Sequence, residues 1–260
     1  MITDIVFDDI EYLYANEEKT NKSNFFIHHH TQYEILYILR GTGTFFIENK
    51  AYSFTDDTVI IIPPGSYHIL KNAPDTDYER FVINFSPELF PENLSFNEDS
   101  VCKYADTEIF GLFDKIRDYS TRFPKETFYL LLKSVLTEFL VIFYSCDNKS
   151  LERVDLPPLI QNAIVFINQN LSRPLDVDTI ANGLYVSKSH LNHTFRKVLN
   201  TGVMQYVRTK KTCAARECVK NGMSASQAAL KFGYRNYTTF LRNYQTEFNE
   251  NPVNTAHKRK

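Results

Sequence analysis

The sequence predicts an α+β protein with two domains, an N-terminal β-barrel carrying a helical layer and an all-helical C-terminal domain. Short β-rich runs separated by turn residues fill residues 24–85, which is typical of a sandwich or a small barrel. From about residue 106, apolar side chains recur with the spacing of amphipathic helices. The charge also changes sign, because residues 1–150 carry 13 Lys and Arg against 24 Asp and Glu, whereas residues 151–260 carry 16 against 7.

The expected strands follow one another closely along the N-terminal half. They cover residues 33–39, 44–47, 51–54, 59–62, 67–70 and 80–85. Gly41 and Gly43 mark the turn after the first strand, because glycine adopts turn conformations without steric cost.

Two helices and a linker are expected after the strands. Ile109 and Ile116 lie on the apolar stripe of the first helix, and the second helix runs from Phe128 to Phe143. This wide second stripe would either cover the barrel or be shared with a second copy of the chain, and we expect a homodimer. The predicted organisation is a barrel over residues 1–100, a helical dimerisation or packing segment over 101–146, a proline-containing linker over 147–158, and a helical domain over 159–260.

Composition argues against a membrane or an exported protein. Lys133 and Glu138 interrupt the most apolar stretch, and the N-terminus carries acids where a signal peptide would carry lysines. The four cysteines include no CxxC pair, which suits a reducing compartment. We therefore expect a cytoplasmic protein without a membrane partner.

The cationic half contains a short helix, a break and a second helix that begins after Ser187, a favourable N-cap residue. Leu191, Phe195 and Leu199 give this second helix an apolar face. The opposite face carries the polar residues Ser189, Asn192, His193 and Arg196.

The same pattern recurs about fifty residues later, where a short helix containing Ala228 and Ala229 leads into a turn at Gly233. Phe240 and Tyr244 then form the apolar face of another helix. Short helix, turn and second helix make up the helix-turn-helix, whose second helix enters the DNA major groove. A plain helical bundle with a solvated polar face is the alternative interpretation. Two such units in one cationic segment favour binding of double-stranded DNA.

Residues 159–257 resemble the DNA-binding domain of the AraC/XylS family of bacterial transcription regulators. The resemblance is carried by Ile180-Ala181, Ser187, His190-Leu191, Phe195-Arg196-Lys197, Gly202, Tyr206, Ala215, Ala228-Ala229, Phe232-Gly233-Tyr234, Phe240, Arg242, Tyr244 and Asn251-Pro252. Lys211 departs from the family pattern, since it stands where an arginine is usual.

The resemblance implies which side chains meet DNA. The expected base contacts are Ser189, Asn192, His193 and Arg196 in the first unit and Tyr237, Thr238, Leu241 and Arg242 in the second. The expected phosphate contacts are Lys188, Lys197, Arg208, Lys210, Lys211 and Arg235.

The acidic half contains two motifs similar to those of cupins. Residues 28–41 read HxHxxxE(x6)G and residues 63–72 read PxGxxHxxxN, although Lys22 and Asp57 stand where cupin motifs open with glycine. AraC-type regulators often carry a cupin-like sensor ahead of the DNA-binding domain. The resemblance therefore implies an effector-sensing cupin-like barrel.

The histidines and the glutamate of these motifs are candidate effector ligands. Residues two apart on a strand share a face, so His28, His30 and Glu34 would point together, with His68 joining them from an opposing strand. Further candidate pocket residues are Tyr37, Tyr67, Arg40 and Phe46. The quartet would also suit a Zn, Fe, Mn or Ni ion, or a purely structural network. We predict no bound metal and no cofactor.

These observations predict a transcriptional regulator and not an enzyme. The barrel would sense a small molecule, a sugar or a related metabolite, and control promoter occupancy by the C-terminal domain. The expected partners are double-stranded DNA, the effector, a second copy of the chain and, for an activator, RNA polymerase. The alternative is a metal-dependent cupin enzyme, a dioxygenase or isomerase, with an accessory helical domain.

Overall fold

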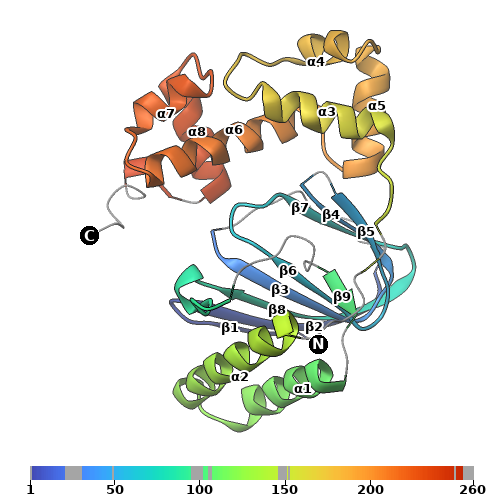
Figure 1. The fold of residues 1–260 in the computed structure, drawn as a ribbon, viewed down its shortest axis with the longest axis vertical. Coiled ribbons are helices and arrows are strands. Elements are labelled where there is room, and N and C mark those ends of the chain that lie inside the picture. The colour runs from blue at the N-terminus through green and yellow to red at the C-terminus, as the bar shows by residue number, and fades with distance from the viewer. Residues whose placement is uncertain are drawn as a thin grey trace. The chain divides into compact units, whose positions relative to one another are not determined.

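The computed structural model describes residues 2–20, 31–48, 50–94, 102–104, 107–145, 151, 153–248 and 250–253. The chain divides into two compact units, Met1–Asp155 and Leu156–Lys260. Strands belong to the first unit, with two helices, and the second unit is helical (Figure 1). This agrees with the fold class that the sequence predicts.

Two antiparallel sheets form the first unit. One has the strand order β1-β2-β8-β3-β6-β9 and the other the order β5-β4-β7. The strands are β1 (Ile2–Val6), β2 (Ile10–Thr20), β3 (Tyr33–Arg40), β4 (Gly43–Ile47), β5 (Lys50–Phe54), β6 (Thr58–Ile62), β7 (His68–Asn72), β8 (Thr76–Phe85) and β9 (Cys102–Tyr104), and a short 3₁₀ helix spans Pro87–Leu89. The sequence pattern did not predict β1, β2 or β9.

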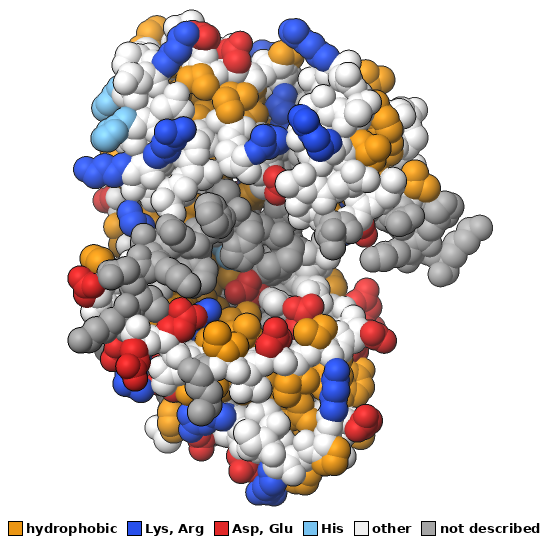
Figure 2. Space-filling view, turned by 180° about the vertical axis from the view of Figure 1, so that it is seen from behind, with side chains coloured by type: hydrophobic (Ala, Val, Ile, Leu, Met, Phe, Trp, Pro, Cys, Tyr) orange, Lys and Arg blue, Asp and Glu red, His pale blue; other side chains and the backbone are white. Residues whose placement is uncertain are grey.

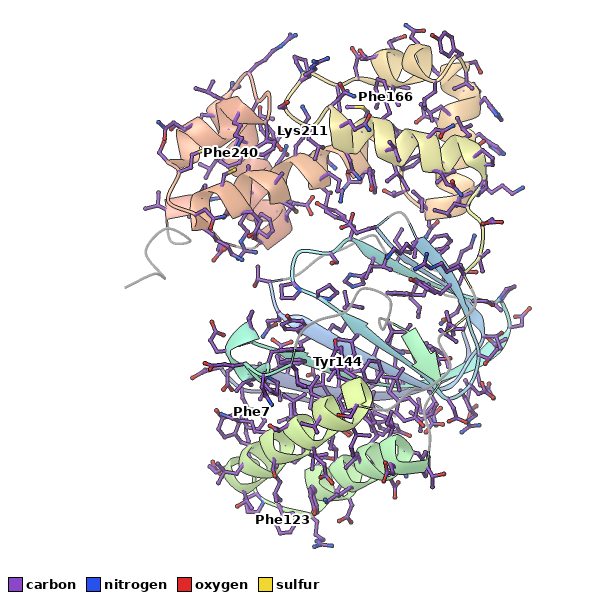
Figure 3. The ribbon with its side chains drawn as sticks, in the orientation of Figure 1. Phe7, Phe123, Tyr144, Phe166, Lys211 and Phe240 are labelled. Atoms are coloured by element: carbon purple, nitrogen blue, oxygen red, sulfur yellow. The ribbon has the colours of Figure 1, made fainter. Side chains whose placement is uncertain are left out.

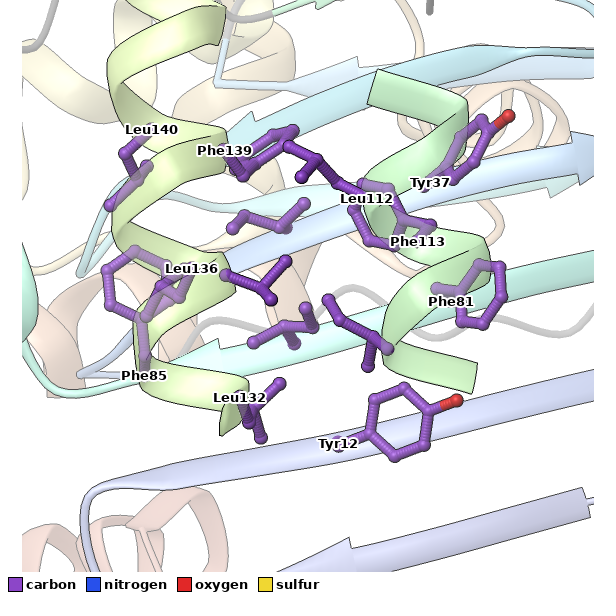
Figure 4. Packing of buried hydrophobic residues seen from close by; sticks show 14 of the residues in the cluster. Tyr12, Tyr37, Phe81, Phe85, Leu112, Phe113, Leu132, Leu136, Phe139 and Leu140 are labelled. Carbon is purple, nitrogen blue, oxygen red and sulfur yellow. The ribbon is translucent and has the colours of Figure 1, made fainter. Parts of the chain in front are cut away.

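One face of the six-stranded sheet packs against two helices, α1 (Thr107–Arg122) and α2 (Lys125–Ser145) (Figures 1 and 4). Side chains alternate along each strand, so every second residue of the sheet reaches this layer. Tyr37 and Phe81 contact Phe113 of α1, with ring centroids 4.7 and 5.3 Å apart respectively. The opposite face of the sheet contributes Leu36, Ile38, Ile60 and Ile62 to an inner core shared with the three-stranded sheet.

Helix α2 is long and apolar enough, by composition, to cross a membrane. In the structure its side chains Phe128, Leu132, Leu136 and Phe139 are buried in the layer against the sheet. The apolar stripe of this helix is therefore used, at least in part, as the cover of the sheet.

After α2, described residues of the chain pack against the strands of the first unit. Leu151 is only 4% exposed and packs in the inner core. Val154 donates its backbone N–H to the Ala51 carbonyl at 2.8 Å, and Arg153 forms a β-bridge with Tyr52. Part of the segment expected as a linker is thus docked on the edge of β5.

The second unit consists of α3 (Pro158–Gln169), α4 (Val177–Gly183), α5 (Lys188–Leu199), α6 (Val203–Lys220), α7 (Ala225–Lys231) and α8 (Tyr237–Phe248). Helices α4 and α5 form one helix-turn-helix unit, and α7 and α8 form the other. The long helix α6 joins them. Buried Leu191 and Phe195 fix the inner face of α5, and buried Phe240 and Tyr244 do the same for α8.

The two turns have the same backbone hydrogen bonds. Val186 donates to the Ala181 carbonyl in the first turn, and Tyr234 donates to the Ala229 carbonyl in the second, both at 3.0 Å. Each turn also contains one residue with positive φ. This residue is Gly233 in the second unit, as the sequence predicts, and the fully solvated Tyr185 in the first. Glycine adopts this conformation readily, whereas tyrosine adopts it with strain.

Candidate functional sites

Helix α5 presents a polar face to solvent. Ser187 caps the helix by accepting from the backbone N–H of His190 at 3.2 Å, which fixes where the first turn begins. Ser189, His193 and Arg196 are exposed, and Asn192 is partly exposed. All four predicted base-contacting residues of the first unit therefore lie on the accessible side of a helix whose other side is packed.

Helix α8 repeats this arrangement. The Asn236 side chain accepts from the backbone N–H of Thr238 at 2.8 Å. Asn236 precedes the first residue of α8, as Ser187 precedes the first residue of α5. Tyr237, Thr238 and Arg242 are exposed, and Leu241 is partly exposed.

Matching the two N-caps brings Gln245 of α8 into the place of Arg196 of α5. Gln245 is exposed, and glutamine can make paired hydrogen bonds to adenine. The predicted set of base contacts omitted it. The turn of the second unit is one residue longer, so alignment by sequence spacing alone does not reveal the equivalence.

Four of the predicted phosphate contacts are accessible cations. Lys188, Lys197, Arg208 and Arg235 are all exposed. Lys188 also makes an ion pair with Asp178 of α4 at 2.5 Å. Figure 2 shows cationic side chains on the second unit and many acidic side chains on the first, which follows the charge asymmetry of the sequence.

The other two expected phosphate contacts, Lys210 and Lys211, are buried, at 8% and 7% exposure, which argues against that role. Lys211 Nζ donates to the Arg173 carbonyl at 2.5 Å and to the Phe232 carbonyl at 3.0 Å. Burial lowers the pKa of this amine. Figure 3 shows Lys211 on α6, between the labelled Phe166 of α3 and Phe240 of α8. Its role is to hold the segment before α4 and the turn after α7 together.

The inner side of the six-stranded sheet borders a cavity of about 260 Å³. Its described lining is Asp4, Val6, Glu11, Leu13, Glu34, Leu36, Phe45, His68, Leu70, Tyr78, Arg80, Val82 and Asn84. The polar members lie mainly on neighbouring strands of the sheet, and the apolar members form its walls. Cavities of this kind, with a few converging polar groups, suit small ligands.

Glu34 and His68 are the two predicted effector residues that the structure brings together. The His68 Nε2 lies 3.3 Å from the Glu34 Oε2, and the His68 Nδ1 donates to the Ser66 carbonyl at 3.0 Å. Both residues are buried and line the cavity. His28 and His30, the other two members of the predicted quartet, lie outside the described residues, so the metal-binding alternative is not tested by geometry.

Tyr37 and Phe46, which were also expected in the pocket, do not line the cavity among the described residues. Tyr37 alternates with Leu36 along β3 and therefore faces the helical layer, where its hydroxyl donates to Asp57 at 3.1 Å. Phe45 lines the cavity, and Phe46, its neighbour on β4, lies on the other face of the three-stranded sheet.

Arg40 and Tyr67 are also outside the cavity lining. The exposed Arg40 at the end of β3 pairs with Glu79 at 2.8 Å, and Tyr67 is buried just before β7. The cavity instead uses Glu11, Tyr78, Arg80 and Asn84, which the sequence pattern did not single out. Alternate residues of a strand share a face, so the predicted strand at residues 80–85 already places Arg80 and Asn84 on one face. Glu11 could not be found in this way, because the sequence pattern did not predict β2.

Comparisons with known proteins identify both kinds of domain. The family model for the AraC-like ligand binding domain matches residues 12–119, and a helix-turn-helix domain model matches residues 180–258. The uncharacterized HTH-type transcriptional regulator YfiF of Bacillus subtilis is 24% identical, with 83% of this chain and 74% of YfiF covered.

More distant or partial similarities also occur. The regulatory protein SoxS of Salmonella typhimurium is 29% identical over 38% of this chain and 94% of its own length. The XylDLEGF operon transcriptional activator of Pseudomonas putida is 28% identical, and the matched region spans 32% of that protein. The crystal structure of ToxT from Vibrio cholerae O395 aligns with 96% of this chain and 98% of its own at 12% identity, with a TM-score of 0.41.

The two domains define a DNA-binding transcriptional regulator with a ligand-sensing domain. The chain belongs to the AraC/XylS family, as its sequence motifs indicated. The alternative of a metal-dependent cupin enzyme is accordingly wrong, because the matched domains and relatives are those of regulators.

Proposed function

We propose that this regulator controls promoter occupancy in response to a sugar or a related metabolite held in the cavity of the first unit. The observation that supports DNA reading most directly is the pair of capped helices, α5 and α8, each packed on one side and polar on the other. Two reading helices on one chain could engage successive turns of the major groove.

Specific contacts follow from side-chain chemistry. Arg196 and Arg242 suit guanine edges, and Asn192 suits adenine. Ser189, His193, Tyr237, Thr238 and Leu241 complete the proposed reading set, and Lys188, Lys197, Arg208 and Arg235 are the proposed phosphate contacts.

The remaining partners are part of the same proposal. The regulator acts in the cytoplasm as a homodimer and, if it activates transcription, contacts RNA polymerase. The domain organisation that supports this function is a sensing barrel over residues 1–100, a helical segment over 101–146, a connection over 147–158 and a DNA-binding domain over 159–260. Glu34 and His68, which line the cavity, are the proposed effector-binding residues.

A gel-shift experiment on the DNA upstream of its own gene tests the proposal. We expect Arg196→Ala and Arg242→Ala each to weaken sequence-specific binding by about 1–3 kcal/mol. Arg122→Ala is the matched control, because Arg122 is an exposed arginine of the first unit that pairs with Asp118 one turn away and lies over the neighbouring Phe123 ring. Unchanged binding by both helix variants, with folding intact, would refute DNA reading by α5 and α8.

A further inference from the structure

The polar end of the cavity is a row of hydrogen-bond acceptors. Asn84 of β8 pairs in register with Glu11 of β2 on one side and with Glu34 of β3 on the other. All three residues line the cavity. Two strand spacings separate the two glutamates, about 10 Å between their backbones. A small molecule above Asn84 would therefore lie between two carboxylates.

The asparagine between them leaves one acceptor unused. Its Nδ2 donates to the Glu11 carboxylate at 3.3 Å. Its buried Oδ1 has no hydrogen-bond partner among the described residues. A buried acceptor without a partner destabilises the folded state, and ionised carboxylates can only accept. A ligand that carries several N–H or O–H donors would satisfy this row.

A second polar side chain points to the same chemistry. Asn72 lies on the face of β7 that also carries His68 and Leu70, both of which line the cavity. Asn72 is 4% exposed, and neither its amide nitrogen nor its amide oxygen has a partner among the described residues. The row His68, Leu70 and Asn72 on β7 therefore ends in an amide group that can both donate and accept hydrogen bonds. A ligand hydroxyl group, which also donates and accepts, would suit this amide.

Electrostatics disfavours an anionic ligand. The described lining contains Asp4, Glu11 and Glu34 against one arginine, Arg80. Arg80 already donates to Glu17 at 3.2 Å, and its guanidinium lies 4.7 Å from the centre of the Tyr78 ring. The arginine of the described lining is thus engaged on the protein, and the three carboxylates border the cavity, with Glu34 also 3.3 Å from His68 Nε2.

The cavity walls suit a small ring. Phe45 and Tyr78 are aromatic, and aromatic faces pack against the apolar faces of sugar rings. Burial raises the pKa of Tyr78, so the phenol remains a neutral hydroxyl. The volume, about 260 Å³, is near the lower limit for ligand pockets and therefore favours a ligand of monosaccharide size.

From this arrangement we infer that the effector is an amino sugar or a closely similar hydroxylated amine, with its ammonium group over Asn84 between Glu11 and Glu34. This inference rests on the proposed function and narrows its effector class. The ammonium donates to both carboxylates and to the unused asparagine oxygen. A carboxylated sugar of the same size would place its negative charge beside the carboxylates of Glu11 and Glu34, and we expect it to be rejected by their repulsion.

Three ligands with one carbon skeleton test the inference on the full-length protein, namely D-glucosamine, D-glucose and D-glucuronate. We expect calorimetric titration and thermal unfolding to show binding in the order glucosamine, then glucose, with glucuronate weakest. Glu34→Gln and Glu11→Gln should each weaken glucosamine binding about tenfold while changing glucose binding little. Glu88→Gln, at an exposed glutamate of the 3₁₀ helix, is the control and should change neither.

Four results would overturn the inference: glucuronate binding as tightly as glucosamine, glucose binding more tightly than glucosamine, no binding of glucosamine, or a preference for glucosamine that survives both glutamine variants. Glu11 is partly exposed, so its variant reports on the site even if Glu34→Gln fails to fold. A gel-shift on upstream DNA with the same protein distinguishes failure of the inferred effector class from failure of the proposed regulator function. Intact DNA binding together with failed glucosamine binding rejects the effector class and retains the regulator.

Discussion

Lys211 shows how a cation in a DNA-binding domain can serve the fold. Its side chain is buried on α6, and its amine donates to two backbone carbonyls, one in the segment before α4 and one in the turn after α7. Carbonyl groups can only accept, so each would lose its donor if the amine were removed. A lysine within a cationic stretch of sequence looks like a phosphate contact, and only the packing of α6 shows otherwise.

We expect Lys211→Ala to lower the free energy of unfolding by about 2 kcal/mol, because a buried and a partly buried carbonyl lose their partner. Urea unfolding of the full chain measures this. Lys197→Ala, at an exposed position of α5, should change stability by less than about 0.5 kcal/mol. If Lys211→Ala instead weakened DNA binding and left stability unchanged, the phosphate-contact assignment would be restored.

Asp176 gives a pH-dependent prediction at the residue scale. It caps α4, and the hydrogen bonds from the backbone N–H and hydroxyl of Thr179 lower the pKa of its carboxyl group. A depressed carboxyl pKa stabilises the folded state at pH values above the unfolded pKa, near 3.9, and this stabilisation is lost as the pH falls through the folded pKa. Asp176→Ala should therefore be less stable than the parent chain at pH 6, with the difference shrinking below about pH 4.

The measurement is urea unfolding across this pH range, with Asp178→Ala as a control. Asp178 lies two residues away in the first turn of α4 and pairs with the exposed Lys188. A stability difference for Asp176→Ala that stays constant down to pH 3 would contradict a capping role for the ionised carboxylate.

At the scale of elements, helical periodicity was a better guide than strand patterning. The apolar spacing predicted α1, α2, α5 and α8, because the apolar residues that a helix buries recur at a fixed spacing within its own sequence. Strands bury a face only in combination with their sheet neighbours. Tyr37 and Glu34 lie three apart on one strand and therefore point to opposite sides, which excluded Tyr37 from the cavity.

The cavity itself could be predicted only in part from sequence. Glu34 and His68 were identified by motif, but Glu11 and Asn84 come from β2 and β8, whose pairing joins residues about seventy positions apart. No local pattern encodes that register. The amphipathic alternation of β2, with Ile10, Tyr12 and Tyr14 buried, was present in the sequence but preceded the region read as strands.

The segment after α2 is an element-scale feature with a measurable consequence. Leu151 is buried in the inner core beside residues that line the cavity, including Phe45 and Leu70. Leu151→Ala should destabilise the first unit by about 2–4 kcal/mol, since a large buried side chain is lost. Thermal and urea unfolding of the full chain measure it. Val154→Ala, at a position 41% exposed, should cost far less, and equal losses for the two variants would contradict specific burial of Leu151.

At the scale of the whole molecule, the separation of charge favours the second unit as the one that meets DNA. Residues 151–260 carry 16 Lys and Arg against 7 Asp and Glu, an excess of nine cationic side chains. Residues 1–150 carry 13 Lys and Arg against 24 Asp and Glu, an excess of eleven acidic side chains. Phosphate contacts release counterions, so each contributes about 0.9 to the slope of log affinity against log salt concentration. The acidic unit should contribute nothing to that slope.

Arg208→Ala should therefore reduce the magnitude of the salt slope by about 0.9 and weaken binding to all DNA sequences alike. Arg208 is exposed on α6, whereas neighbouring Lys210 is buried and its substitution by alanine should leave the slope unchanged. Gel-shifts of the full chain over a series of salt concentrations, on specific and scrambled DNA, measure both slopes. Equal slopes for the parent chain and the Arg208 variant would show that α6 stands away from the phosphate backbone, and would leave the cations of α5 and α8 as the source of the electrostatic binding energy.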